Sequence, residues 1–491
     1  MTSMYHISDL KKFNRCPRLF LQSQQDEKMP FYSYIRMDEA VSDLAARKLG
    51  VEKPFVGTLG DDPSLALEAL KDHDWLMKAR FEYGGLRIKV PFMHRNGDAW
   101  ELYFLFTGLY PHNNDMELYC DTVWVLEQNG IQLSDVMIVH LNEAYVREDE
   151  LDIDELFIVS RSLYNFNNNP TIPFFDEIRK QMKDPQETIR KMSECTAETL
   201  SEPVRTNKCA GRLKCRYYDS CFPNEAEAED DSIMTLIAAK HRYQMEQEGL
   251  LYLRDADVER IEGSPQQYAQ ILADRCGGLF ADKMALQAWL EGTVYPVSFL
   301  DFEWERYAVP PYKGMKPYQV LPFEYSLHIL HADGTVDHKV FLSVHDDRRE
   351  LTESLIRDVP EQGTIIAYNA EGAEKIRISE MAEQFPEYAD TLLEMNARMK
   401  DLQIPFISGM IYDVRMRGSW TLKQIMSMME DPGYSQLEIR QGMDAVFQWR
   451  QLDRDEDVNK DEIIDDLKKY CGMDSWAMVV VYKWIRECAG L

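Results

Sequence analysis

Four acidic side chains in the second half of the chain have the residue types and spacing of a metal-dependent catalytic site. Asp301 and Glu303 lie two positions apart in an apolar run. Glu374 follows another short apolar run, and Asp474 lies four residues after Tyr470. Carboxylate oxygens are the ligands that Mg²⁺ and Mn²⁺ prefer. Two such ions can hold a phosphodiester, lower the pKa of an attacking water and stabilise the leaving oxygen. The acids therefore predict a two-metal phosphodiesterase site.

The first two acids need a strand to hold them together. The run 297–302 is typical of a buried strand, and alternate strand residues face the same side. Asp301 and Glu303 therefore project together, where two unpaired buried carboxylates would be costly. A bound cation resolves that conflict. The alternative is a solvated strand face that has no metal.

The last pair belongs to a predicted helix over residues 463–485. Tyr470 and Asp474 are four residues apart, so they lie on one side of that helix. There Tyr470 is expected to orient the attacking water while Asp474 binds a metal. The alternative is a helix whose rim carries a Tyr and an Asp by chance, and the pair gains weight only beside Asp301 and Glu303.

The order of elements predicts a mixed α/β protein in three parts. The acidic run 225–231 marks the first boundary, after strands that include the Asn96-Gly97 hairpin turn. The expected domains are residues 1–231, a helical connector at 232–290, and a second α/β domain at 291–491. For the last domain we expect the following segments: strands 297–302, 325–330, 336–342 and 364–368, helices 348–359 and 463–485, and a helix capped by Ser419.

Composition and charge narrow the class of protein. The chain has 491 residues and a formal net charge of −29, which argues against a protein that coats nucleic acid along its length. A nuclease with a small basic groove and its own metals stays compatible with that charge. There is no secretory pattern and no membrane-spanning run, so we expect a cytoplasmic protein. Nine cysteines in such a chain argue against a disulfide framework.

The acidic motifs resemble those of the DEDD exonuclease superfamily, in its tyrosine-containing branch. The resemblance rests on Asp301-x-Glu303, on Asn369 followed by Glu374, and on Tyr470-x-x-x-Asp474. It implies a ribonuclease-H-like domain and 3′–5′ exonuclease activity that releases nucleoside monophosphates. It also implies two Mg²⁺ or Mn²⁺ ions bound by Asp301, Glu303, Glu374 and Asp474, with Tyr470 positioning the water.

Two observations bear on that resemblance. The last histidine in the chain is His345, so no histidine can take the base position near Asp474. The second motif of the superfamily usually ends in a bulky apolar residue and Asp, whereas this chain has Ala373-Glu374. Asp401 is therefore an alternative third ligand, and Asp413 is a weaker one.

The stretch 295–485 also resembles an uncharacterised bacterial domain family of unknown function that accompanies RecB-like nucleases. The matching residues are Tyr295-Pro296, Phe299 to Glu303, Pro317 to Phe323, Ser326 to His328, Gly418-Ser419, Leu422-Lys423 and Tyr470-Cys471 with Asp474. If the domain is an exonuclease, Lys423 would contact a substrate phosphate. The alternative is that Lys423 is a solvated helix residue.

Four cysteines in the first part of the chain predict a second metal site. Cys209, Cys215 and Cys221 lie at regular spacing, and Cys16 lies near the N-terminus. Four thiolates can hold an iron–sulfur cluster or zinc. One distant cysteine followed by three resembles the cluster-bearing RecB-like nucleases of the PD-(D/E)XK fold, in which a 4Fe-4S cluster joins the ends of the domain. Zinc is the alternative.

The nuclease chemistry of that fold is missing from the sequence. The family carries Asp and then Glu-x-Lys on adjacent strands, but the corresponding positions here read as Phe104 and Phe106. Residues 87–93 offer no Asp, and no lysine occurs between Lys89 and Lys180. We therefore expect a degenerate nuclease domain that binds nucleic acid or a protein partner; a plain structural domain is the alternative.

Together these patterns predict a metal-dependent 3′–5′ exonuclease. The resemblance of residues 1–231 to DNA-processing nucleases favours DNA over RNA, and a role in repair or defence. A non-enzymatic scaffold for nucleic acid or protein, built from remodelled nuclease folds, is the first alternative. An RNA-trimming enzyme is the second.

Overall fold

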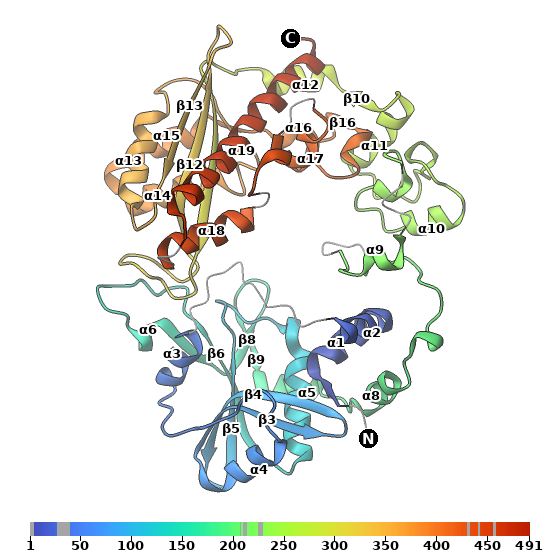
Figure 1. Ribbon diagram of the computed structural model, residues 1–491, viewed down its shortest axis with the longest axis vertical. Coiled ribbons are helices and arrows are strands. Elements are labelled where there is room, and N and C mark those ends of the chain that lie inside the picture. Colours follow the sequence, from blue (N-terminus) through green and yellow to red (C-terminus); the bar gives the residue numbers. More distant parts are fainter. Residues whose placement is uncertain are drawn as a thin grey trace. The chain divides into compact units, whose positions relative to one another are not determined.

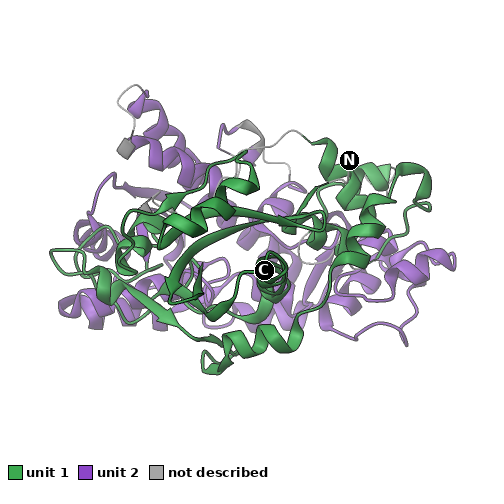
Figure 2. Cartoon of the chain, turned by 90° about the horizontal axis from the view of Figure 1, so that it is seen from below, with its two compact units in different colours: residues 1–223, 306–319 green, residues 224–305, 320–491 purple. Residues whose placement is uncertain are grey.

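The computed structural model describes residues 4–26, 40–206, 208–209, 214–223, 229–429, 433–439, 442–454 and 458–491. The chain forms two compact units, coloured separately in Figure 2. Unit 1 comprises residues 1–223 and 306–319, and unit 2 comprises residues 224–305 and 320–491. Part of the acidic run expected to mark a boundary, residues 225–228, lies outside the described residues.

Unit 1 is built on a seven-stranded mixed sheet (Figure 1). Antiparallel neighbours β3, β4 and β5 form its centre, and β6 adds in parallel to β5. The strands are β1 (Tyr5–His6), β2 (Phe55–Val56), β3 (Trp75–Tyr83), β4 (Leu86–Asn96), β5 (Ala99–Leu105), β6 (Leu133–Leu141) and β7 (Phe157–Ser160). The expected hairpin at Asn96-Gly97 is confirmed, since Asn96 pairs with Ala99.

Two apolar clusters cover the sheet of unit 1. One joins the strands to helices that include α1 (Ile7–Arg15), α2 (Pro17–Gln25) and α5 (Met116–Gln128). The other packs α3 (Ala40–Lys48) against the sheet and includes Ala308 and Val309 from the segment 306–319. That short segment, which interrupts the second α/β region of the sequence, thus belongs to the core of unit 1.

Unit 2 contains a five-stranded mixed sheet in the order β13-β12-β11-β14-β15. Strands β12 and β13 are antiparallel, whereas β14 is parallel to both β11 and β15. The strands are β11 (Val297–Arg306), β12 (Val320–Leu330), β13 (Val336–Leu342), β14 (Ile365–Ala367) and β15 (Met399–Asp401). The four strands expected from the sequence of this region are confirmed, and β15 was not expected.

Helices cover both faces of this sheet, as Figure 1 shows. On one face lie α13 (Arg348–Asp358), α14 (Glu374–Gln384) and α15 (Ala389–Ala397), which pack against Leu300 and Phe302 of β11. On the other face lies α19 (Lys460–Ala489), a 30-residue helix. It packs against Val297 and Phe299. The odd-numbered residues of β11 therefore face α19.

The segment 232–290 is mostly short helices, as expected, with one short strand, β10 (Leu279–Ala281), and it belongs to unit 2. Its α-helices are α10 (Arg242–Gln247), α11 (Pro265–Arg275) and α12 (Lys283–Leu290). The predicted cap at Ser419 is wrong. Helix α17 (Leu422–Met426) begins after Thr421, whose side chain accepts a hydrogen bond from the Gln424 amide. Across the described part of the chain, no helix has the length and apolar character needed to cross a membrane.

Candidate functional site

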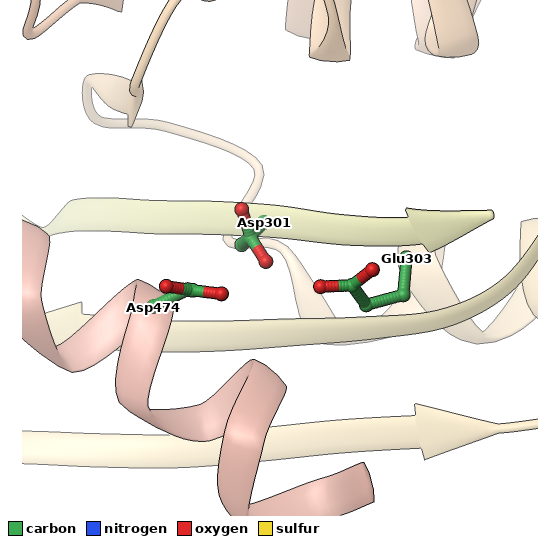
Figure 3. A group of neighbouring side chains, drawn as sticks. All are labelled: Asp301, Glu303 and Asp474. Carbon is green, nitrogen blue, oxygen red and sulfur yellow. The ribbon is translucent and has the colours of Figure 1, made fainter. Parts of the chain in front are cut away.

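Asp301, Glu303 and Asp474 meet in unit 2, between the sheet and helix α19 (Figure 3). One carboxylate oxygen from each residue lies within 4.8 Å of the others. Asp301 and Glu303 extend from β11, and Asp474 reaches toward them from the helix. All three side chains are half-buried, so each keeps some contact with solvent. The arrangement offers three oxygen ligands to one small region of space.

The local sequence explains this convergence. Because Val297 and Phe299 pack against α19, the alternation along β11 turns Asp301 and Glu303 toward the same helix. The apolar stripe of α19, with Met478, Val481 and Tyr482, anchors the helix on that face. One turn earlier than Met478, Asp474 then lies over the acidic end of β11.

The surroundings make this cluster unfavourable without a cation. Burial raises the pKa of Asp301 and Glu303 well above the ordinary values, and the charges of neighbouring carboxylates raise both further. Burial raises the pKa of Asp474 to about 6, opposed by hydrogen bonding from Tyr434 and by the charge of Lys423. Carboxylates that repel one another in a low-polarity site favour either a proton or a metal ion.

Glu374 is the better placed of the proposed third ligands. It is the first residue of α14, is 3% exposed, and has an Oε2 atom with no hydrogen-bond partner in the described structure. Burial raises its pKa to about 8. Its charge also raises the pKa of Asp301 and Glu303. Glu374 lies outside the tight triad and extends the acidic site beyond it.

The two alternative third ligands have other partners. Asp401 Oδ1 accepts hydrogen bonds from the backbone amides of Asn369 at 2.9 Å and Gln403 at 2.8 Å. It thereby holds the turn that precedes Glu374. Asp413 forms a two-point ion pair with Arg415, at 2.9 and 2.7 Å. Both carboxylates are therefore already used in holding the fold.

A further buried acid, Glu324, was missed in the sequence. It lies on β12, is fully buried, and neither carboxylate oxygen has a hydrogen-bond partner in the described structure. Burial raises its pKa well above the ordinary value, and the charge of Asp474 adds to this effect. In turn Glu324 raises the pKa of Glu303. No motif spacing marks Glu324, because a neighbouring strand of the sheet brings it close.

Two tyrosines and a lysine line the same site. Lys423 Nζ donates a hydrogen bond to the Tyr470 hydroxyl at 2.9 Å, and the Tyr434 hydroxyl donates one to Asp474 Oδ1. Burial and the carboxylate charges raise the pKa of Tyr470, so its hydroxyl stays protonated. Gly442 leaves room beside them: a Cβ there would lie 3.8 Å from Glu303 Oε2 and 4.0 Å from the Tyr470 hydroxyl. Tyr434 and Gly442 were not expected.

Helix α19 is fixed behind the site by a buried polar cluster. Ser475, the residue after Asp474, is hydrogen-bonded to Ser326 at 2.7 Å and to His328 Nδ1 at 2.8 Å. The ring of His328 stacks on that of His338 at 4.1 Å. Three residues before Asp474 on the same helix, the Cys471 thiol lies 3.6 Å from Asp301 Oδ2. These contacts set the rotation of the helix and therefore the direction of Asp474.

The four predicted metal-binding cysteines line one cavity in unit 1. Cys16, Cys209, Cys215 and Cys221 are half-buried and surround a space of ≈ 520 Å³. Cys16 lies at the junction of α1 and α2, where Arg15 donates a hydrogen bond to the backbone oxygen of Lys208 at 2.8 Å. Burial raises the pKa of Cys221, and the other three thiolates add to this effect.

In the described structure these four sulfurs are not as close together as the ligands of a bound zinc ion. A tetrahedral zinc with bonds of about 2.3 Å holds its sulfurs about 3.8 Å apart. Within the described part of the chain, no three cysteine sulfurs lie within 4.8 Å of one another. Four thiols around one cavity are the donors that either an iron–sulfur cluster or zinc requires.

The two phenylalanines that stand where the RecB-like nucleases are expected to have ligands also line a cavity of unit 1. Phe104 is the buried sixth residue of β5, and Phe106 follows the strand. Both line a space of ≈ 780 Å³, together with Lys78 and Lys89. Where the resemblance to RecB-like nucleases would place acids and a lysine, the structure therefore has aromatic rings beside two lysines.

Comparisons with known proteins identify one region of the chain. No curated protein matches the chain, and no solved structure matches it. Residues 298–421 match the model of a domain of unknown function, DUF2779. This domain contains Asp301, Glu303 and Glu374, whereas Tyr470 and Asp474 lie beyond the matched residues. The finding agrees with the expected resemblance to an uncharacterised domain family and identifies residues 298–421 as a DUF2779 domain. Most of the matched residues belong to unit 2, and residues 306–319 belong to unit 1.

Proposed function

We propose that the chain is a metal-dependent 3′–5′ exonuclease that releases nucleoside monophosphates. The observation that carries the proposal is the meeting of Asp301, Glu303 and Asp474 within 4.8 Å, next to the hydroxyl of Tyr470. The direct test is the release of mononucleotides from the 3′ end of a labelled strand with Mn²⁺ or Mg²⁺, and its loss in EDTA. No release from either DNA or RNA in any divalent metal would exclude the proposal and leave a binding scaffold as the alternative.

The acidic residues divide naturally between two ions. Asp301, Glu303 and Asp474 would hold one, while Glu374, with its unpartnered oxygen, would help to hold a second shared with Asp301. Bound divalent cations would polarise the phosphodiester and lower the pKa of the attacking water. The mixed sheet of unit 2, with helices on both faces, supports the ribonuclease-H-like fold implied by the DEDD resemblance.

The remaining side chains of the site would orient the reactants. The protonated hydroxyl of Tyr470 is suited to hydrogen-bond the attacking water, and Lys423 helps to fix that hydroxyl by donating a hydrogen bond to it. Lys423 also lies 5.1 Å and 4.8 Å from the ring centroids of Tyr434 and Tyr470, so its charge is held at the site. It is therefore positioned to neutralise a substrate phosphate.

Replacing Tyr470 by Phe is expected to lower kcat by about 10- to 100-fold, because the water loses a positioning hydroxyl. Metal binding should persist, since Phe leaves the four acids in place. Initial rates on labelled DNA and the Mn²⁺-induced rise in Tm measure the two effects separately. Tyr482→Phe on the same helix is the matched control and should keep its activity. Equal rates for Tyr470→Phe and wild type would remove Tyr470 from the mechanism.

For unit 1 we propose a degenerate PD-(D/E)XK nuclease fold that carries a 4Fe-4S cluster. The four half-buried thiols around one cavity support this assignment. Cys16 comes from the start of the chain and the other three come from the end of the unit, so a bound cluster would join the two ends. We further propose DNA as the preferred substrate, with repair or defence as the setting; the cytoplasmic location stays a prediction.

Protein purified without oxygen is expected to be brown, with broad absorption near the boundary of the visible and ultraviolet, and to contain about four irons per chain. Cys16→Ser should lose the colour and most of the iron, whereas Cys276→Ser, a change of an exposed cysteine outside the cavity, should retain both. A colourless protein that contains zinc instead would contradict the cluster.

A further inference from the structure

The cavity beside Phe106 lies where the sheet of unit 1 opens. Strand β4 pairs with β5 through its second half, Phe92 to Asn96, and with β1 through Leu86 and Arg87. Between these two stretches β4 leaves β5. The cavity of ≈ 780 Å³ lies there and is lined by residues of β3, β4, β5 and α5. Its walls are therefore formed by strands and helices of the unit.

The charge of this cavity differs from that of the chain as a whole. Lys78 and Lys89 line it and are exposed, and within the described part of the chain neither forms an ion pair. Arg87 also lines it and is paired with Glu82. The acid on the wall, Asp115, is paired with Lys11 at 2.9 Å. Two lysines are thus available to an anion, in a chain whose net charge is −29.

The backbone at Lys78 is unusual for a strand residue. Its φ is +52°, a left-handed backbone conformation that residues other than glycine rarely adopt. The pairs Met77–Phe92 and Ala79–Val90 bracket Lys78 and Pro91, and the latter has no backbone N–H. The ladder between β3 and β4 is therefore interrupted where both residues line the cavity. Such strain is retained where the surrounding structure or a function requires it.

Aromatic rings form the apolar part of the wall. Phe106 is half-buried, and its ring lies over Gly108, where a Cβ would come within 2.6 Å of the ring. Phe104 packs edge-on against Tyr119, with 4.6 Å between ring centroids. Phe104 and Tyr119 are buried, so they support the wall, while Phe106 keeps an accessible surface. The cavity thus combines a supported aromatic ring with two available cations.

We propose that this cavity binds single-stranded nucleic acid, with its phosphates at Lys78 and Lys89 and a base stacked on Phe106. Cations bind the phosphate backbone, and an aromatic ring accepts any base because each base has a π-face. A duplex keeps its bases stacked inside and cannot use the ring. The proposal goes beyond the exonuclease activity and does not depend on it, because the cavity belongs to unit 1 and the acids to unit 2.

The test is the fluorescence anisotropy of a labelled oligothymidylate with the full-length protein in EDTA, which prevents hydrolysis. Lys78→Glu/Lys89→Glu should weaken binding by at least about tenfold and reduce its salt dependence. Phe106→Leu keeps an apolar side chain but removes the π-face, and should weaken binding by about tenfold with little change in Tm. The matched control Lys71→Glu/Lys180→Glu reverses two exposed helical lysines of unit 1 outside the cavity and should stay within about twofold of wild type.

Competition identifies the class of ligand. Unlabelled oligothymidylate should displace the probe, and an equal concentration of duplex or of inorganic polyphosphate should displace it far less. The proposal would be overturned by no binding to wild type, by unchanged binding to the cavity variants, or by an equal loss in the control variant. Equal displacement by polyphosphate would also overturn it, since the ring would then contribute nothing. Binding without hydrolysis in Mn²⁺ would count against the exonuclease alone.

Discussion

Replacing Asp301 by Asn is expected to lower the rate of nucleotide release by at least about 10³-fold. The substitution removes the charge of a metal ligand, and the site then loses several kcal/mol of transition-state stabilisation. Asn has nearly the same shape, so the fold should persist. Asp301 belongs to the triad that meets within 4.8 Å and adjoins Glu374, which makes it the acid suited to serve both ions. The measurement is the initial rate on labelled single-stranded DNA in Mn²⁺, repeated with RNA.

Two further variants test the assignment of the third ligand. Glu374→Gln should lower the rate by about 10²-fold, because an amide binds a divalent cation more weakly than a carboxylate. Asp401→Asn should lower Tm but keep the rate of the folded protein, since Asp401 Oδ1 accepts two backbone hydrogen bonds. If Asp401→Asn lost as much activity as Asp301→Asn at an unchanged Tm, Asp401 would be the ligand. Full activity in Asp301→Asn would exclude the site altogether.

The triad was predictable because each of its members follows from a local rule. Strand alternation places Asp301 and Glu303 on one face, and the helix repeat places Asp474 beside Tyr470. That these two elements face each other came only from the family resemblance. Nothing in the spacing required α19 to lie over the odd-numbered residues of β11.

The residues that were missed reach the site through long-range packing. Glu324 comes from the adjacent strand, and Gly442, far along the chain, lies where an added Cβ would be 3.8 Å from Glu303 Oε2. No motif marks either residue. The error at Ser419 has a local cause: Ser419 and Thr421 are both good helix caps, and the structure starts the helix after Thr421. The segment 306–319 is rich in Pro and Tyr and has no acidic residue, but this composition does not say against which unit it packs, so its place in the core of unit 1 could not be predicted.

Divalent metal is expected to change the pH dependence of stability. In the metal-free protein burial raises the pKa of Asp474 to about 6 and that of Glu374 to about 8. Between about pH 4 and pH 8 the folded protein therefore holds more protons than the unfolded chain, and its free energy of unfolding falls as pH rises. The stability that these protons contribute is fully present below the pKa values of the unfolded chain. It is lost as pH rises through the pKa values of the folded protein. Added Mn²⁺ replaces the protons, so its effect should be largest near pH 8.

Measurements of Tm from about pH 5 to about pH 8, with and without Mn²⁺, check this expectation. At a metal concentration about 100 times Kd, Tm should rise by about 5 °C near pH 8 and by much less near pH 5. Because the net charge of −29 also lowers stability as pH rises, a single-site comparison is needed. Asp301→Asn removes one of the repelling charges, so without metal it should be more stable than wild type near pH 8, by about 1 to 3 kcal/mol.

A second buried acid serves as a control that distinguishes the effect of a metal ligand from the effect of any buried carboxylate. Asp413 is also buried in unit 2, but it is paired with Arg415, so Asp413→Asn should be less stable than wild type and keep the full response to Mn²⁺. The opposite signs of the two Asp→Asn changes follow from their partners: one carboxylate faces other carboxylates and the other faces a guanidinium. If both variants lost stability and both kept the Mn²⁺ response, the acids at Asp301 would not form a cation site, and the exonuclease proposal would fail with them.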